Sequence, residues 1–392
     1  MKATAIMVMA GIALVACAGA ALAHHSFAAQ YDATKHVELK GVVTKIEWTN
    51  PHARFYVDEK NDKGEVTAWN FEMASPNVLL RNGWKRTSLE IGEQVTVTGY
   101  LARTGPPAGP KMAIAESLTA SDGRCLPRRR RTCRHASGHE RRSAMTSRAA
   151  AFALIAVLVA AAPLLHAQTR LGGNIRANPP SGPVPRLPDG KPDMTGVWLG
   201  GLPVGDISTA LPKGETMPIR PEWKKKMDEF QANDDPQAHC LPLPPPRFTP
   251  YPWRMVVTPT HTFFLYEMYD YRQVFMDGRK HPSGDDLDPT WKGHSIGRWD
   301  GDTLVIDTVG YNDKTWFDNK GWPHSDKMHL TERYTRTDLG TMKVEMTIDD
   351  PVAYTKPFTV TGAARLMPNE ELVEYVCDEN NQDAPYLQGA KP

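Results

Sequence analysis

GHSIGRWDGDTLVIDT, residues 293–308, alternates apolar and polar side chains on both sides of an Asp-Gly pair. Asp300-Gly301 is a strong signal for a two-residue turn, so the stretch predicts a β-hairpin. A turn at these two residues places His294 directly opposite Asp307. Because side chains alternate along a strand, Arg298 lies on the same face as this pair.

The three side chains on that face support two interpretations. A carboxylate opposite an imidazole orients the ring and raises its basicity, which is what a general base requires, so His294, Asp307 and Arg298 are candidate catalytic residues of a hydrolase or isomerase. Opposite charges that face each other across two strands are also an ordinary stabilising device. The sequence leaves both interpretations open.

The rest of residues 254–392 continues the β pattern, with short strands at regular spacing and turn signals between them. This predicts an antiparallel lipocalin-like β-barrel or a sandwich, and a barrel of this kind holds one small ligand. A Pro/Gly-rich entry over residues 168–253 precedes it, with a first strand near 196–199 and a short helix over 222–231 that begins after Pro221. The expected strands are 254–258, 262–268, 271–276, 294–299, 302–309, 328–337, 341–349, 357–366 and 371–377.

A second polar cluster follows the hairpin and contains His324, His329 and Arg333. We expect these three to be candidate ligand-binding residues near the rim of the barrel. His329 and Glu332 point to opposite faces of one strand, so they cannot serve the same interior site without a bulge. The unit has no H-E-x-x-H zinc motif and no Gly-rich phosphate loop, which argues against a zinc protease and a nucleotide enzyme.

Residues 24–123 form a separate β-rich unit. Ser75 is suited to cap a helix that ends near Arg81, before Gly83. Three strands, a helix and two strands is the element order of the OB-fold, a small Greek-key barrel. The expected strands are 37–48, 54–58, 66–73, 94–101 and 112–118.

Several short runs give the first unit a family resemblance. It resembles a family of small exported bacterial proteins, domain-of-unknown-function family 6152, which implies fold and export but no chemistry. The second unit resembles a recurrent exported bacterial β-rich type, also without assigned activity. The resemblance of the first unit is carried by His24–Ala29, Lys40–Val43, Glu47–Ala53, Trp69–Glu72 and Ser75–Asn77, and that of the second by Pro188–Gly190, Gly293–Trp299, Gly301–Thr308 and Glu374–Cys377.

The histidines of the first unit suggest a metal site. Cleavage of a leader after Ala23 would make His24 the N-terminal residue, whose α-amine and imidazole chelate a metal with His25, His36 or His52 as a further ligand. A set of nitrogen ligands suits Cu(II). The other interpretation is a solvated, frayed terminus.

The loop between the first two strands is a further candidate ligand site. OB-folds bind ligands there, and this loop contains Trp48, Asn50 and His52. The other interpretation is a structural corner fixed by Pro51, with Trp48 in the core. A nucleic-acid ligand is not expected, because the unit lacks a basic groove and the whole chain has a formal charge of only +1.

Two stretches have the three zones of an export signal: a basic start, an apolar core and a small-residue exit. One ends at Ala23, although Cys17 lies in a sequence that resembles a lipidation box. The other lies in mid-chain, beginning at Met145 with its apolar run over 149–165. A run of this length is short for a membrane span. We therefore expect a periplasmic or secreted protein that meets the membrane only through these signals or lipidation.

The Arg-rich segment between the units has no apolar periodicity, and the whole chain looks like two secreted proteins joined as a fusion. An oxidising compartment permits a disulfide between Cys240 and Cys377. The expected function is binding of a small molecule or metal ion by a pair of β-barrels rather than catalysis. The expected segments are a signal peptide 1–23, an OB-fold-like domain 24–123, a disordered junction 124–148, an apolar signal-like helix 149–167, an entry 168–253 and a barrel 254–392.

Overall fold

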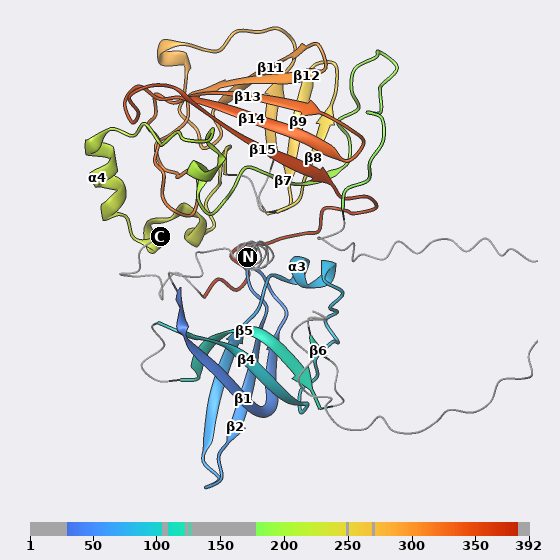
Figure 1. Ribbon diagram of the computed structural model, residues 1–392, viewed down its shortest axis with the longest axis vertical. Helices are drawn as coiled ribbons and strands as arrows, with labels where there is room; N and C mark the ends of the chain where they lie inside the picture. Colours follow the sequence, from blue (N-terminus) through green and yellow to red (C-terminus); the bar gives the residue numbers. More distant parts are fainter. Residues whose placement is uncertain are drawn as a thin grey trace, which may run out of the picture.

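The computed structural model describes residues 30–103, 109–121, 125–126, 178–247, 251–268 and 271–382. They form two mostly β units, a first unit of residues 30–126 and a second unit of residues 178–382 (Figure 1). Both expected export signals, with Cys17, and almost all of the expected Arg-rich junction lie outside the described residues. No helix in the described part of the chain is long and apolar enough to cross a membrane.

The first unit is a closed barrel of five strands in the order β1-β2-β3-β5-β4, with β6 added to β5. The helix lies between β3 and β4 in sequence, which is the element order that the sequence predicted. Phe55, Val57 and Phe71 pack inside it and are fully buried. The elements are β1 (Tyr31–Glu47), β2 (Arg54–Lys60), β3 (Val66–Glu72), α3 (Pro76–Arg81), β4 (Gln94–Ala102), β5 (Lys111–Ala120) and β6 (Cys125–Leu126).

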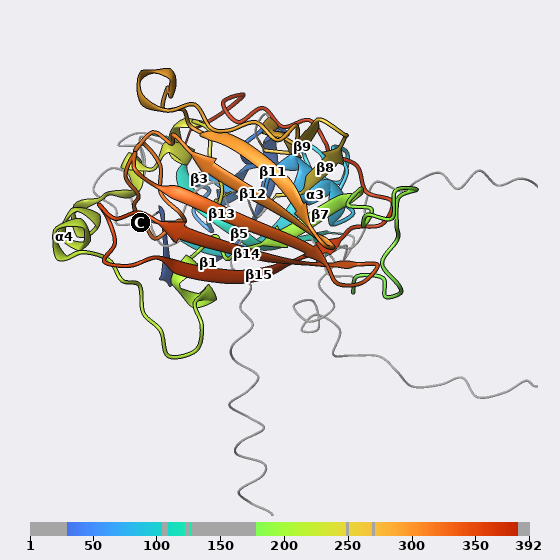
Figure 2. The same ribbon diagram turned by 90° about the horizontal axis from the view of Figure 1, so that it is seen from above.

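The second unit is a closed barrel of nine strands, in the order β10-β11-β12-β13-β14-β15-β7-β8-β9. Figure 2 shows β11 to β15 lying side by side. The pairings are antiparallel except between β10 and β11, which are parallel over two residue pairs. The strands are β7 (Val197–Gly201), β8 (Trp253–Val257), β9 (His261–Tyr266), β10 (Tyr271–Phe275), β11 (His294–Asp300), β12 (Thr303–Val309), β13 (His329–Arg336), β14 (Thr341–Asp349) and β15 (Phe358–Leu366).

Within the residues that the structure describes, four short helices lie on the chain between β7 and β8, and a fifth, η4, lies between β10 and β11. Pro221 occupies the first turn of α4 (Pro221–Glu229), which is the position where a missing backbone N–H costs nothing. The 3-10 helices are η1 (Ile207–Ala210), η2 (Ala232–Asp234), η3 (Pro236–His239) and η4 (Gly284–Asp286).

The interior of the larger barrel is packed with aromatic and sulfur-containing side chains. Trp198, Trp253 and Phe264 are fully buried there with Met342 and Met346. A charged pair, Arg272 and Glu332, also lies inside. The interior positions near these residues are therefore occupied by side chains.

The hairpin of residues 293–308 forms, but its expected register was wrong by one residue at the turn. The turn residues are Gly301 and Asp302, and Asp300 pairs with Thr303. Gly301 has φ +59°, a conformation that glycine adopts without a Cβ clash, at the first central position of the turn. The shift moves each partner by two residues, so the faces are preserved while the direct pairs change.

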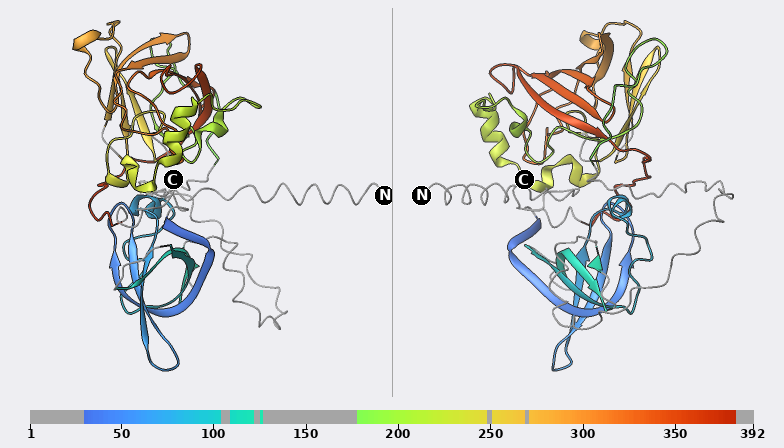
Figure 3. Two further views of the ribbon diagram at one scale, coloured as in Figure 1. Left: turned by 90° about the vertical axis from the view of Figure 1, so that its left-hand side faces the viewer. Right: turned by 45° about the vertical axis from the view of Figure 1, so that its right-hand side comes forward.

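The expected strand over 371–377 does not form. Its backbone is held by side chains instead of a neighbouring strand. The N–H of Val373 donates to Glu267 at 3.0 Å, and the carbonyl oxygens of Val373 and Glu374 accept from the Asn77 amide at 3.3 and 3.2 Å. Asn77 belongs to the first unit, so this segment joins the two units. Figure 3 shows the units one beyond the other, with α3 facing the larger barrel.

Candidate functional site

A cluster of three histidines surrounds Asp307 on the outer face of the larger barrel. His281 Nε2 lies 2.8 Å from Asp307 Oδ1, and His329 Nε2 lies 2.7 Å from Asp307 Oδ2. His281 Nδ1 lies 2.9 Å from His294 Nδ1. Strands β11, β12 and β13 contribute one residue each, and the loop after β10 contributes His281. We call His281, His294, Asp307 and His329 the histidine cluster.

The expected direct contact between His294 and Asp307 was wrong. In the observed register His294 pairs with Val309, and Asp307 pairs with Ile296. The two side chains share a face but sit diagonally, and His281 bridges them. Arg298 shares that face but is exposed to solvent, opposite Val305. The face is the outer one, because Leu304, Ile306 and Thr308 point into the barrel.

The pKa values of the histidines in the histidine cluster are shifted in opposite directions. The hydrogen bond to Asp307 raises the pKa of His329 above its ordinary value, and the same bond lowers the pKa of Asp307. Burial lowers the pKa of His294, and the nearby His281 and Arg279 lower it further. His294 is therefore biased toward the neutral imidazole and His329 toward the charged form.

These contacts define a chain of proton donors and acceptors. If His281 donates from Nε2 to the Asp307 carboxylate, its Nδ1 is the acceptor for the Nδ1–H of His294. The other nitrogen of His294, Nε2, then carries a lone pair. In this tautomer the Nε2 lone pair of neutral His294 is a proton acceptor at the end of the chain.

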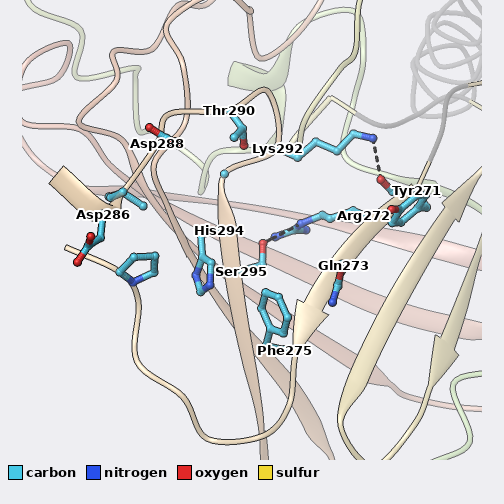
Figure 4. Close-up of a pocket in the computed structure, with 13 residues that line it drawn as sticks. Tyr271, Arg272, Gln273, Phe275, Asp286, Asp288, Thr290, Lys292, His294 and Ser295 are labelled. Atoms are coloured by element: carbon cyan, nitrogen blue, oxygen red, sulfur yellow. Dashed lines mark hydrogen bonds between the residues drawn. The ribbon is translucent and has the colours of Figure 1, made fainter. Parts of the chain in front are cut away.

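A pocket of about 590 Å³ adjoins His294 (Figure 4). It lies where the short parallel pairing of β10 and β11 ends, and the loop before β11 forms its other wall. Phe275 stacks on His294 with ring centroids 5.2 Å apart, and Arg279 lies over the same phenyl ring at 3.7 Å. The lining comprises Tyr271, Arg272, Gln273, Phe275, Pro282, Asp286, Leu287, Asp288, Thr290, Lys292, Gly293, His294 and Ser295.

Lys292 is the distinctive charged group of the pocket wall. Its Nζ donates to the Tyr271 carbonyl at 2.8 Å, and burial lowers the pKa of the amine to about 8. This amine beside an aromatic surface is weakly solvated, so a ligand oxygen that accepts its hydrogen bond satisfies it better than bulk water does. Asp286 and Asp288 lie at the opposite side of the pocket in Figure 4, so its two ends differ in charge.

Gly310 allows a close packing contact beside the pocket. Gly310 has φ +74°, and a Cβ there would lie 2.7 Å from the Leu287 side chain. The close approach lets the pocket-lining loop pack on the turn after β12. A larger residue at position 310 would displace that wall.

The second expected cluster is not one site. His324 is 2% exposed, with Nε2 2.6 Å from Thr315 Oγ1 and its ring stacked on Phe317. It is therefore part of the core rather than of a rim. His329 belongs to the histidine cluster, whereas Arg333 forms an exposed ion pair with Asp300 at 2.8 Å.

Residues Gly293–Gly297 have the spacing G-x-S-x-G of a nucleophile elbow, which requires an exposed serine on a strand-to-helix turn. Here Ser295 lies within β11, is 1% exposed and accepts hydrogen bonds from Arg272 at 3.0 and 3.1 Å. Its side chain points to the opposite face of the strand from His294. The spacing is therefore not matched by the geometry of a serine hydrolase.

The expected ligand loop of the first unit is covered by the second unit. The N–H of Asn50 donates to Glu379 at 2.8 Å, and Trp48 packs partly buried against the small barrel's core. His52 is 2% exposed, and its Nδ1 lies 3.2 Å from the Met73 carbonyl oxygen. The loop is thus a structural corner at the contact between units.

The expected Cu(II) ligands His24 and His25 lie outside the described residues. Their proposed partner His52 is buried and faces Glu72 at 3.5 Å. Within the described ranges, no group of three or more His, Cys, Asp or Glu side chains is arranged to hold a metal ion. Cys240 and Cys377 form a disulfide with a Cα–Cα distance of 5.5 Å, which anchors the segment after residue 370 to the loop after η3.

Two residues that the sequence did not single out complete the candidate site, His281 and Lys292. Both lie in the irregular segment between β10 and β11, where no periodicity indicates which way a side chain points. The only sequence signal was their closeness to the hairpin that contains His294. A search for polar residues that flank the hairpin would have identified His281 and Lys292.

The comparisons with known proteins concern the first unit. Residues 12–111 match the model of a family of unknown function, DUF6152. No curated protein and no solved structure matches the chain.

Proposed function

We propose that the second unit binds a small amphipathic organic molecule in the pocket between β10 and β11, and that the protein is exported to carry out this binding. The observation that supports this is the pocket of about 590 Å³ that joins an aromatic wall to the half-buried amine of Lys292. Its volume is in the range of small-molecule sites. A lipocalin-like barrel would hold its ligand in the interior, but side chains fill that interior here. We therefore place the binding site on the outer wall.

The residues that line the pocket indicate which chemical groups the ligand carries. An apolar or aromatic group fits against Phe275 and Leu287, and a carbonyl or carboxylate oxygen accepts from Lys292. Asp286 and Asp288 disfavour an anionic group at the other end. We therefore propose a ligand with one acidic or carbonyl end and one apolar end.

Fluorescence of 8-anilinonaphthalene-1-sulfonate with the full chain tests the binding site. We expect saturable binding that 2-naphthoate displaces, and an affinity at least tenfold weaker in Lys292→Met, because the sulfonate loses its cation. The matched control is Lys343→Met, which removes an exposed lysine on β14. Equal affinities in the two variants would overturn the proposal.

A second candidate function is general-base catalysis in the same pocket. It is favoured by the chain of contacts from Asp307 through His281 to His294, which lines the pocket. Turnover of 4-nitrophenyl acetate tests it. His281→Gln should lower the rate about as much as His294→Gln if the relay operates, whereas a rate unchanged by both variants leaves binding alone.

A further inference from the structure

The two units meet at a surface whose centre is a buried charged group. Arg81, the last residue of α3 in the first unit, makes a bidentate contact with Glu267 of the second unit. Its guanidinium also donates to the Glu371 carbonyl at 2.9 Å, and its Nε lies 3.4 Å from Glu370 Oε2. The side chains of Arg81, Glu267 and Glu370 are at most 2% exposed.

Apolar and amide contacts surround this charged centre. Val78 of α3 clusters with Tyr251 and Met268 of the second unit. On the other side, the N–H of Asn380 donates to the Asn50 carbonyl at 2.9 Å, and its side-chain amide donates to Thr49 Oγ1 at 3.1 Å. Asn77 adds the two bonds to residues 373 and 374 described above. The surface thus has a buried core and a hydrogen-bonded periphery, like a specific protein interface.

Each unit is nevertheless complete as a barrel. The five strands of the first and the nine of the second close on themselves, and every strand pairing among the described residues stays within one unit. Their cores are separate clusters. Contact between the units therefore depends on side chains and on one irregular segment, which is how independent partners associate.

Two of the five runs that carry the family resemblance contribute to this surface. Glu47–Ala53 and Ser75–Asn77 supply Thr49, Asn50 and Asn77 to the contacts with residues 373–380. Part of the resemblance therefore lies in residues that contact the second unit.

We propose that the first and second units are binding partners that stay associated without the segment between them. The first unit recognises the extended segment 370–381 and the Glu267 carboxylate of the second. Arg81 makes the association selective, because a partner without an acid at this place would leave a buried guanidinium unpaired. The mid-chain export signal expected from the sequence fits two units that are made to meet after export.

The test uses the full chain with a specific protease site placed within residues 127–177. After cleavage, we expect the two fragments to elute together in size-exclusion chromatography with light scattering. Arg81→Glu should separate them, and adding Glu267→Arg should restore a large part of the association. Lys85→Glu is the matched control, because it makes the same charge change at an exposed residue close to α3.

Separate elution of the cleaved wild-type fragments, each retaining its near-ultraviolet circular dichroism, would overturn the proposal. If Arg81→Glu prevents folding, Glu267→Gln is the second variant. It keeps the side-chain shape and should weaken association about tenfold or more, since it removes the charge of the carboxylate that Arg81 contacts through two hydrogen bonds and leaves only the more distant Glu370. Association as tight as wild type in Glu267→Gln would also contradict the proposal.

Discussion

The two faces of β13 place charged residues one position apart in opposite surroundings. Glu332 points into the larger barrel, is fully buried, and bonds to Arg272 and to the Tyr334 hydroxyl at 2.7 Å. Arg333 points outward and pairs with Asp300, both more than 40% exposed. An arginine and a carboxylate thus form an enclosed network on one face and a solvated pair on the other.

The difference shows how burial decides the role of an ion pair. Inside the barrel, the Arg272 guanidinium is also held by Ser295 and Thr308, so the charges are compensated by several partners. Such a network is costly to break, because removing one partner leaves a charge without water or counter-ion. Outside, water replaces a lost partner at little cost.

Glu332→Ala should produce the largest effect. The unfolding free energy of the larger barrel should fall by about 3–5 kcal/mol, since Arg272 loses its counter-ion in the interior. Urea unfolding followed by tryptophan fluorescence measures the change. Replacing both partners, Arg272→Met with Glu332→Leu, is the control and should cost far less than the single change. A single-variant loss below about 1 kcal/mol would contradict the role of burial.

Tyr334→Phe should have the next largest effect. It removes one hydroxyl donor to Glu332 while leaving Arg272 in place, and a hydrogen bond to a charged group contributes about 1.5–3 kcal/mol. We expect a loss near the lower end of that range, because the carboxylate keeps its other partners. Tyr271→Phe, at a tyrosine that is 56% exposed, controls for the chemical change and should leave the urea midpoint unaltered. A similar loss in both variants would contradict the prediction.

The pH dependence of stability should distinguish two histidines on the outer face. His329 has a raised pKa, so its stabilisation is present below pH 6.5 and is lost as the pH rises through its folded pKa. His294 has a lowered pKa, so its stabilisation is present above pH 6.5 and is lost as the pH falls through its folded pKa. Both contributions should be small, because the two side chains are partly exposed to solvent.

Urea midpoints between pH 5 and 8 measure these opposed slopes. Each slope is compared with wild type, because burial also lowers the pKa of His324, which adds a rising contribution to every variant. His329→Gln should make the slope of stability against pH more positive than in wild type, and His294→Gln should make it more negative. Changes of the same sign in the two variants would show that the histidine cluster titrates in another way.

The alternation of apolar residues predicted most of the larger barrel, including the strands around the hairpin. Alternation determines which residues share a face, so the sequence correctly placed His294, Arg298 and Asp307 on one face although the turn was misassigned. A shift of two residues in register preserves faces and changes partners. For that reason the sequence could indicate which residues share a surface but not which of them touch.

The rest of the site could not be read from periodicity. His281 and Lys292 lie in irregular chain, whose path depends on the packing of Leu287 against Gly310. The segment 371–377 has a strand-like composition, but its hydrogen bonds go to Asn77 and Glu267, which are remote in sequence. Contacts with residues remote in sequence determine these conformations, so the local sequence pattern could not predict them.

Arg333→Ala should have the smallest effect, and it completes the comparison between the faces of β13. Its partner Asp300 is more than half exposed, so water solvates either charge when the other is removed. We expect a urea midpoint indistinguishable from wild type, and no further change when Asp300→Ala is added. Raising the salt concentration to about 1 M should screen the exposed pair and leave the Arg272–Glu332 network intact. A clear loss of stability in Arg333→Ala at low salt, absent at high salt, would show that the exposed face contributes more than its solvation implies.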